Sequence, residues 1–191
     1  AYERAINAFP GSDFERAAMF YRADGYRRSK NPRTIEAFRE AAEASLKQDR
    51  RVFRNAHLSA DRLREIFTGS WRDYQSGRQF PDAIAIAELY LPFAQGGIAY
   101  QMRADSAREL GDELMRRAAG ELYLDAQGTR AEAWTYFDLA GADYLQAARA
   151  EQASDQYQDL LWQAALSSYE GHVYERCHDV LRELLLEHGG G

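Results

Sequence analysis

The chain has 191 residues, of which 46% are hydrophobic and 28% charged, and its formal net charge is −6. This hydrophobic content excludes a wholly disordered chain, and the length suffices for one well-buried domain or a short array of repeats. No apolar run approaches the roughly 20 residues that span a bilayer, and the first residues lack the pattern of a secretory signal, so membrane insertion is not expected.

The charge is distributed unevenly along the chain. Residues 1–54 contain 12 Lys/Arg and 8 Asp/Glu, whereas residues 55–191 contain 12 and 22. Affinity for a duplex comes largely from neutralising phosphates on a concentrated basic face, so an acidic body argues against a nucleic-acid partner. Arg22, Arg27, Arg28 and Arg33 cluster near one turn. They could bind a carboxylate or phosphate, but a solvated loop is the simpler interpretation.

Apolar residues recur at helical spacing almost throughout the chain. Four runs show this spacing in chain order: Ile35, Phe38, Ala41 and Ala42; Leu63, Ile66 and Phe67; Trp134, Phe137, Ala140 and Tyr144; Val180, Leu181, Leu184 and Leu185. We find neither sustained strand alternation nor a β-hairpin turn between β-branched runs. The sequence therefore predicts an all-α fold.

Turn-forming residues divide this pattern into about eight predicted helices. Proline in a first helical turn and Ser, Thr or Asp ahead of a helix are typical of helix starts, because the first amides need an acceptor. The predicted breaks lie at Pro10-Gly11-Ser12, residues 29–32, Phe80-Pro81-Asp82, Gly96-Gly97, Gly128-Thr129 and Gly171-His172.

Four segments align as internal repeats, each beginning with a tyrosine and a short polar turn. The tyrosines lie 48, 49 and 46 residues apart, and a small residue follows each by eight to ten positions. A larger or apolar residue stands four positions further on. The tyrosines are Tyr26, Tyr74, Tyr123 and Tyr169; the small residues are Thr34, Ala83, Ala133 and Cys177; the later residues are Phe38, Ala87, Phe137 and Leu181.

This spacing predicts a helical hairpin in each segment. A tyrosine near the end of the first helix would cover the turn, and the small residue would let the second helix approach to about 8–10 Å. One hairpin cannot bury its apolar face alone, so the copies are expected to stack on one another.

The order of tyrosine, glycine-containing turn, small residue and aromatic residue resembles the tetratricopeptide repeat (TPR) family. Gly77, Gly128 and Gly171 stand close to the turn glycine of that family. The resemblance implies an α-solenoid of about four antiparallel helical hairpins in a right-handed superhelix, with units longer than the family's usual repeat. It implies one domain over residues 1–191, with a partial unit at 1–10 and units at 12–47, 57–94, 98–150 and 154–188.

The opening YERAINAF looks like the second half of a unit, so we expect the chain to be part of a longer protein. The stretch over residues 9–41 also resembles bacterial envelope-associated TPR proteins. These likenesses rest on short segments of the chain.

The TPR resemblance also implies a function, a non-enzymatic scaffold that binds a peptide or helix of another protein. The first helices of the units would line a concave groove. Arg27, Arg72 and Arg117 would bind carboxylates there and Phe20 would be an apolar anchor. The groove positions transferred by register are Phe20, Asp24, Arg27, Thr68, Arg72, Gln75, Arg117, Glu121, Gln163, Ser167 and Glu170.

Two other functions remain open. One is a metal-binding or enzymatic domain that uses His172, Cys177 and His178, although metal sites commonly need three or four ligands and adjacent helical residues point about 100° apart. A small buried slot in the repeat accounts for the single cysteine without such chemistry. The other is a structural spacer or a self-association segment. No cofactor or metal is expected.

Overall fold

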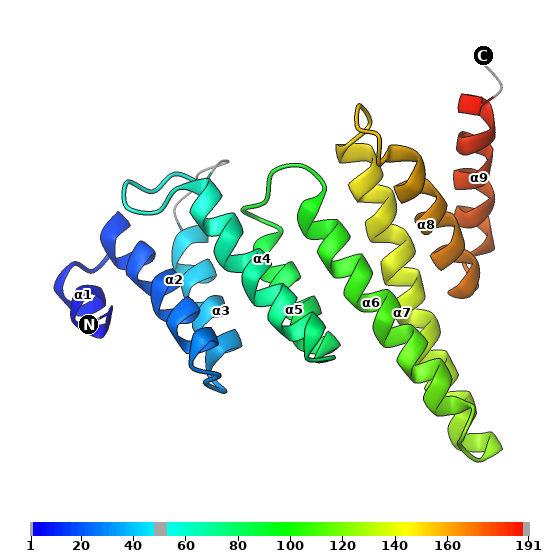
Figure 1. Ribbon diagram of the computed structural model, residues 1–191, viewed down its shortest axis with the longest axis horizontal. Coiled ribbons are helices and arrows are strands. Elements are labelled where there is room, and N and C mark those ends of the chain that lie inside the picture. Colours follow the sequence, from blue (N-terminus) through cyan, green and yellow to red (C-terminus); the bar gives the residue numbers. More distant parts are fainter. Residues whose placement is uncertain (1, 48–52, 189–191) are drawn as a thin grey trace. The chain divides into compact units, whose positions relative to one another are not determined.

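The computed structural model describes residues 2–47 and 53–188, and it divides into two compact units over residues 1–94 and 95–191. Within the described ranges the fold is all-α, with nine helices and no strand (Figure 1). The all-α prediction is confirmed, with one helix more than the eight expected. No described helix is long and apolar enough to cross a membrane.

Unit 1, residues 1–94, consists of a short first helix and two helical hairpins. Its helices are α1 (Tyr2–Ala8), α2 (Asp13–Arg28), α3 (Thr34–Leu46), α4 (Ala60–Ser76) and α5 (Phe80–Tyr90). Helix α1 packs on α2, and α2–α3 and α4–α5 are the hairpins. Between the hairpins, α2 contacts α4 and α3 contacts α5. The first helices of the two hairpins, α2 and α4, therefore lie side by side, and so do the second helices, α3 and α5.

Local start signals begin three of these helices, and those at Ser12 and Pro81 were predicted from the sequence. The Ser12 hydroxyl accepts a hydrogen bond from the Glu15 amide at 3.1 Å, and the Ser59 hydroxyl accepts one from the Arg62 amide at the same distance. Pro81 stands in the first turn of α5, where a missing N–H costs nothing. These caps fix where α2, α4 and α5 begin.

An aromatic core holds unit 1 together, with Phe67 of α4 at its centre. The ring centroid of Phe67 lies 5.8 Å from that of Phe20, 5.1 Å from Phe38 and 4.8 Å from Tyr90. All four side chains are almost completely buried, and each such burial contributes about 1.5–3 kcal/mol. Because these residues come from α2, α3, α4 and α5, the core fixes α2 beside α4.

Unit 2, residues 95–191, contains two longer and two shorter helices. They are α6 (Ile98–Ala118), α7 (Tyr123–Ala150), α8 (Tyr157–Glu170) and α9 (Tyr174–His188). Helix α7 packs against both α6 and α8, and α9 packs against α8. Gly111 allows the Phe137 ring to approach α6, since a β-carbon there would lie only 2.8 Å from it.

Three of the four hairpin turns share one backbone geometry. Lys30, Arg78 and His172 have positive φ angles of 53°, 56° and 61°. The amide of each donates to a carbonyl three residues earlier, and the next amide donates to a carbonyl five residues earlier. This is the Schellman pattern that ends many helices. The turn between α6 and α7, all of it described, has no residue with positive φ.

The turns show where the predicted tyrosine register is correct and where it is wrong. In the first two hairpins, the carbonyls of Tyr26 and Tyr74 accept the hydrogen bond from the amide five residues later. In the last hairpin the carbonyl of Ser168, not that of Tyr169, accepts the equivalent bond. Tyr123 is the first residue of α7 and is 71% exposed, so it cannot cover a turn at the end of a first helix.

Two further expectations fail. Helix α7 runs without interruption through Gly128-Thr129, so the break predicted there is wrong. The Thr129 side chain is buried and donates a hydrogen bond to Glu121, and this packing stabilises the helix locally. Cys177 is partly exposed rather than buried, unlike Ala83 and Ala133, because it lies on the terminal helix α9.

The expected units over residues 12–47, 57–94, 98–150 and 154–188 each contain one helix pair. Their arrangement as one repeat domain stays a prediction.

Candidate functional site

In each unit, polar side chains from two first helices meet. In unit 1 the α2/α4 face comprises Asp24, Arg27, Arg28, Arg62 and Asp73. In unit 2 the α6/α8 face comprises Asp105, Arg108, Gln163, Ser167 and Glu170. Each face combines residues far apart in sequence, which makes these faces the candidate functional sites.

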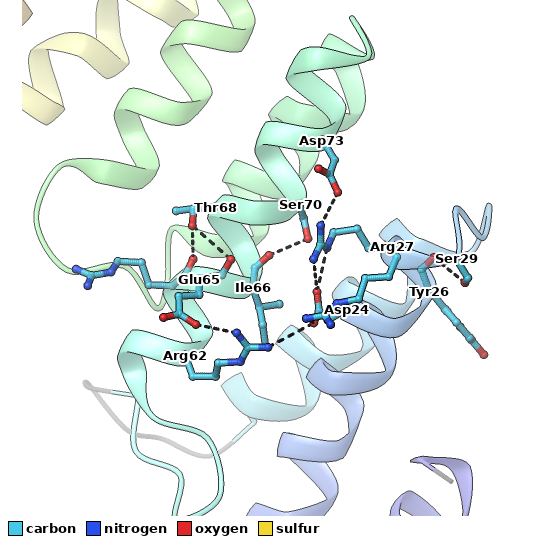
Figure 2. Close-up of polar contacts among 12 residues, drawn as sticks. Asp24, Tyr26, Arg27, Ser29, Arg62, Glu65, Ile66, Thr68, Ser70 and Asp73 are labelled. Carbon is cyan, nitrogen blue, oxygen red and sulfur yellow. Dashed lines mark hydrogen bonds and ion pairs between the residues drawn. The ribbon is translucent and has the colours of Figure 1, made fainter.

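Asp24 is the centre of the α2/α4 face. Its side chain is only 6% exposed, and its Oδ1 accepts hydrogen bonds from Nε and Nη2 of Arg27 at 2.9 and 2.8 Å. Its Oδ2 lies 2.8 Å from Nη2 of Arg28 and 3.7 Å from Nη2 of Arg62. Figure 2 shows the guanidinium groups of Arg27 and Arg62 reaching the carboxylate from different helices. One buried carboxylate thus holds three arginines.

Arg27 connects α2 to α4. Its Nη1 donates to Asp73 of α4, and its guanidinium lies over Gly69, where a β-carbon would be 3.8 Å from the Arg27 Cζ. Burial lowers the pKa of Arg27, but the hydrogen bonds to Asp24 and Asp73 outweigh it and raise the pKa above its ordinary value. The group is always charged and serves as a brace between the helices.

A cleft lies at one end of this face, between the α2–α3 turn and the α4–α5 turn. Its volume is about 770 Å³, and its lining includes Arg27, Lys30, Asp73, Tyr74 and Asp82. Burial raises the pKa of Tyr74. The lining carries charges of both signs, so it offers donors and acceptors to a polar ligand.

Arg108 is the corresponding centre of the α6/α8 face. Its Nη1 donates to Oε1 of Gln163 at 2.7 Å and lies 3.5 Å from the Ser167 hydroxyl. Its Nη2 is 3.4 Å from Oε2 of Glu170, a carboxyl whose pKa is raised by burial. Three residues of α8 are thereby tied to one arginine of α6.

Asp105 lies one turn before Arg108 and is only partly buried. Its Oδ1 accepts a hydrogen bond of 2.7 Å from the Tyr144 hydroxyl of α7. Burial raises the pKa of Asp105 and also that of Tyr144. Both residues line a cleft of about 410 Å³ together with Gln101, Asp159 and Gln163.

The structure brings together five of the eleven residues predicted for the groove. Asp24 and Arg27 lie on the α2/α4 face, and Gln163, Ser167 and Glu170 lie on the α6/α8 face. Arg72 is exposed on α4, whereas Thr68 and Gln75 are partly exposed there. The Thr68 hydroxyl donates to the carbonyl of Arg64 in its own helix at 2.8 Å.

The other placements correct the prediction. Phe20 is 0% exposed within the aromatic core of unit 1, so it cannot be an apolar anchor for a partner. Asp24 and Ser167 are also buried, and they hold arginines in place instead of facing a groove. Arg117 and Glu121 pair with each other at 2.7 Å beside the α6–α7 turn. Both also line a cleft together with Thr129, and their assignment to a groove stays a prediction.

Five functional candidates were missed from the sequence, namely Arg62, Asp73, Asp105, Arg108 and Tyr144. A signal for two of them was present. Gln101, Asp105 and Arg108 follow one another at intervals of four and three residues, which places a polar stripe on one face of α6. The partners on α8 are 55 or more residues away and carry no local signal.

The His172, Cys177 and His178 cluster is not assembled into a site. The His172 ring packs 4.3 Å from that of Trp134, and its Nδ1 lies 3.0 Å from the Tyr174 hydroxyl. The His178 side chain is 76% exposed and faces Asp179. Across the described residues, no group of three or more His, Cys, Asp or Glu side chains could hold a metal ion.

Comparisons with protein-family models, curated proteins and solved structures gave no match. Function is therefore inferred from the residues of the two faces.

Proposed function

We propose that the chain is a non-enzymatic protein–protein interaction scaffold that binds a peptide or helix of another protein along its first helices. The proposal includes the TPR-like architecture, in which the hairpins form an α-solenoid with a right-handed superhelix. In that arrangement, α2, α4, α6 and α8 would line the concave side.

One observation supports this proposal above the others. In each unit an arginine braces two first helices from different hairpins, so that their side chains form a continuous polar face. Such a face is stiff before binding, which lowers the entropic cost of association. Guanidinium groups at its edge suit the carboxylates and carbonyls of a peptide. Arg28 is 61% exposed, and Arg72 has no ion-pair partner in the described part of the chain.

The charges of the two faces do not favour nucleic acid. The arginines of the α2/α4 face are largely neutralised by Asp24 and Asp73, and the α6/α8 face contains Asp105 and Glu170. Residues 1–94 carry 16 Lys/Arg and 13 Asp/Glu, a net charge of +3, whereas residues 95–191 carry 8 and 17, a net charge of −9. A phosphate backbone would be repelled by the second unit.

The proposal can be tested by charge reversal on the first helix α4. Arg72→Glu is expected to reduce partner capture from a source lysate by about tenfold, equivalent to about 1.4 kcal/mol, without changing helical circular dichroism. The matched control is Arg39→Glu, on an exposed position of α3. Equal capture by the two variants would contradict the proposal.

A second candidate function is self-association, and the tip of the α6–α7 hairpin favours it. Leu122, Tyr123 and Leu124 are 81%, 71% and 79% exposed there. Consecutive exposed apolar residues commonly mark an interaction site. Light scattering over a range of protein concentrations separates this function from partner binding, because only self-association changes the mass of the purified chain.

A further inference from the structure

We propose that the cleft between α6 and α8 binds the cationic side chain of an arginine or lysine in the partner segment, with Asp105 as its counter-ion. This inference rests on the proposed function and deepens it, since it assigns a chemistry to one position of the bound segment.

The surroundings of Asp105 differ from those of Asp143 and Glu170, two other carboxylates of this unit. Asp143 is held by Arg103 through two hydrogen bonds of 2.6 and 2.8 Å, and Glu170 lies beside Arg108. Asp105 accepts a hydrogen bond from the neutral Tyr144 hydroxyl, and no described cation forms an ion pair with it.

A carboxylate removed from water is costly unless a cation compensates it. The pKa of Asp105 agrees with this geometry, because burial raises it more than Arg108 lowers it. Arg108, whose charge acts on Asp105, makes its contacts elsewhere, with Gln163, Ser167 and Glu170. The cleft therefore contains an anionic group whose counter-ion can come from a ligand.

The rest of the cleft suits a long cationic side chain. Its lining includes the amide side chains of Gln101 and Gln156 and the carboxylate of Asp159, and none of its lining residues is Lys or Arg. Its volume of about 410 Å³ falls within the range of about 300–1,000 Å³ usual for ligand sites. A guanidinium offers five donors and an ammonium three, so either could engage Asp105 and an amide oxygen together.

The charge of the whole unit favours the same ligand. Residues 95–191 contain 8 arginines and 17 acidic residues, so a cationic segment is attracted before it makes contact. A segment rich in carboxylates would be repelled. The chemistry of this unit therefore selects a basic peptide.

The inference can be tested on the full chain with a defined probe, the peptide acetyl-Gly-Gly-Arg-Gly-Gly-amide. A peptide in which citrulline replaces arginine has nearly the same shape but no charge. In a ¹⁵N NMR titration, the arginine peptide is expected to shift the amide signals of residues 101–108 and 156–163 saturably. The citrulline peptide is expected to bind at least tenfold more weakly.

Two variants isolate the role of the carboxylate. Asp105→Asn is expected to weaken binding of the arginine peptide at least tenfold. Asp159→Asn, at the cleft wall, is expected to weaken it about threefold. The matched control Asp125→Asn removes the same charge at an exposed position near the α6–α7 turn and is expected to change nothing. If Asp105→Asn and Asp125→Asn weaken binding equally, net charge alone explains it and the inference is wrong. Absence of saturable shifts in wild type overturns it as well.

These outcomes are distinct from a failure of the proposed function. If Arg72→Glu reduces partner capture but Asp105→Asn does not change it, the proposed function stands. The inference that the cleft binds a cationic side chain is then wrong. Capture that is unchanged by both substitutions would contradict the proposed function itself.

Discussion

The buried carboxylate of Asp24 is shared by three arginines, Arg27 and Arg28 of α2 and Arg62 of α4. Asp24 and Arg27 are three residues apart on one predicted helix, so their proximity could be predicted. The register assigned both to partner binding, but the structure pairs them with each other. Arg62 joins them from α4, and this contact depends on tertiary packing around Phe67, which no local pattern encodes.

Removal of the Asp24 charge tests this role. Asp24→Asn keeps the size of the side chain but leaves three guanidinium groups without their shared counter-ion. We expect the free energy of unfolding to fall by about 3 kcal/mol, since breaking a buried ion pair typically costs about 3–5 kcal/mol. The control Asp61→Asn breaks an ion pair whose carboxylate is 82% exposed, and should cost less than about 0.5 kcal/mol. Urea denaturation measures both, and equal losses would refute the role of Asp24.

The helices were largely predictable as elements, because their start signals are local. The caps at Ser12 and Pro81 were read correctly from residue type. The Gly128-Thr129 break was not, since packing of Thr129 against Glu121 outweighs the weak helix propensity of glycine and threonine. Breaks were predicted at residues 29–32 and at Gly171-His172, but the positive φ of Lys30, Arg78 and His172 was not, because a non-glycine residue gives no signal for it.

Two glycines within helices should respond oppositely to the same substitution. At Gly69 a β-carbon meets only the Arg27 guanidinium at ordinary contact distance, so Gly69→Ala should stabilise the protein by about 0.5–1 kcal/mol through lower entropy of the unfolded chain. At Gly111 the β-carbon would lie 2.8 Å from the buried Phe137 ring, so Gly111→Ala should cost about 1–3 kcal/mol. Thermal and urea unfolding measure the sign, and the same sign at both positions would contradict the packing described.

The sequence predicted that first helices would carry the binding residues, but not how the two polar faces are built. Gln163, Ser167 and Glu170 were assigned to a binding surface, and all three converge on Arg108. Arg108 itself was missed because its partners are 55 or more residues away. The charge difference between the units is readable from sequence once the boundary at residue 94 is known.

Site-specific photo-crosslinking tests the central claim most directly. A benzophenone amino acid would be placed on first helices at Arg72 and Gln101, and on second helices at the exposed positions Arg39 and Gln146. Mass spectrometry then identifies what each position captures from a source lysate. If the first helices bind the partner, positions 72 and 101 should yield the same crosslinked protein and positions 39 and 146 should yield none. Capture of that protein mainly from positions 39 and 146 would contradict the account.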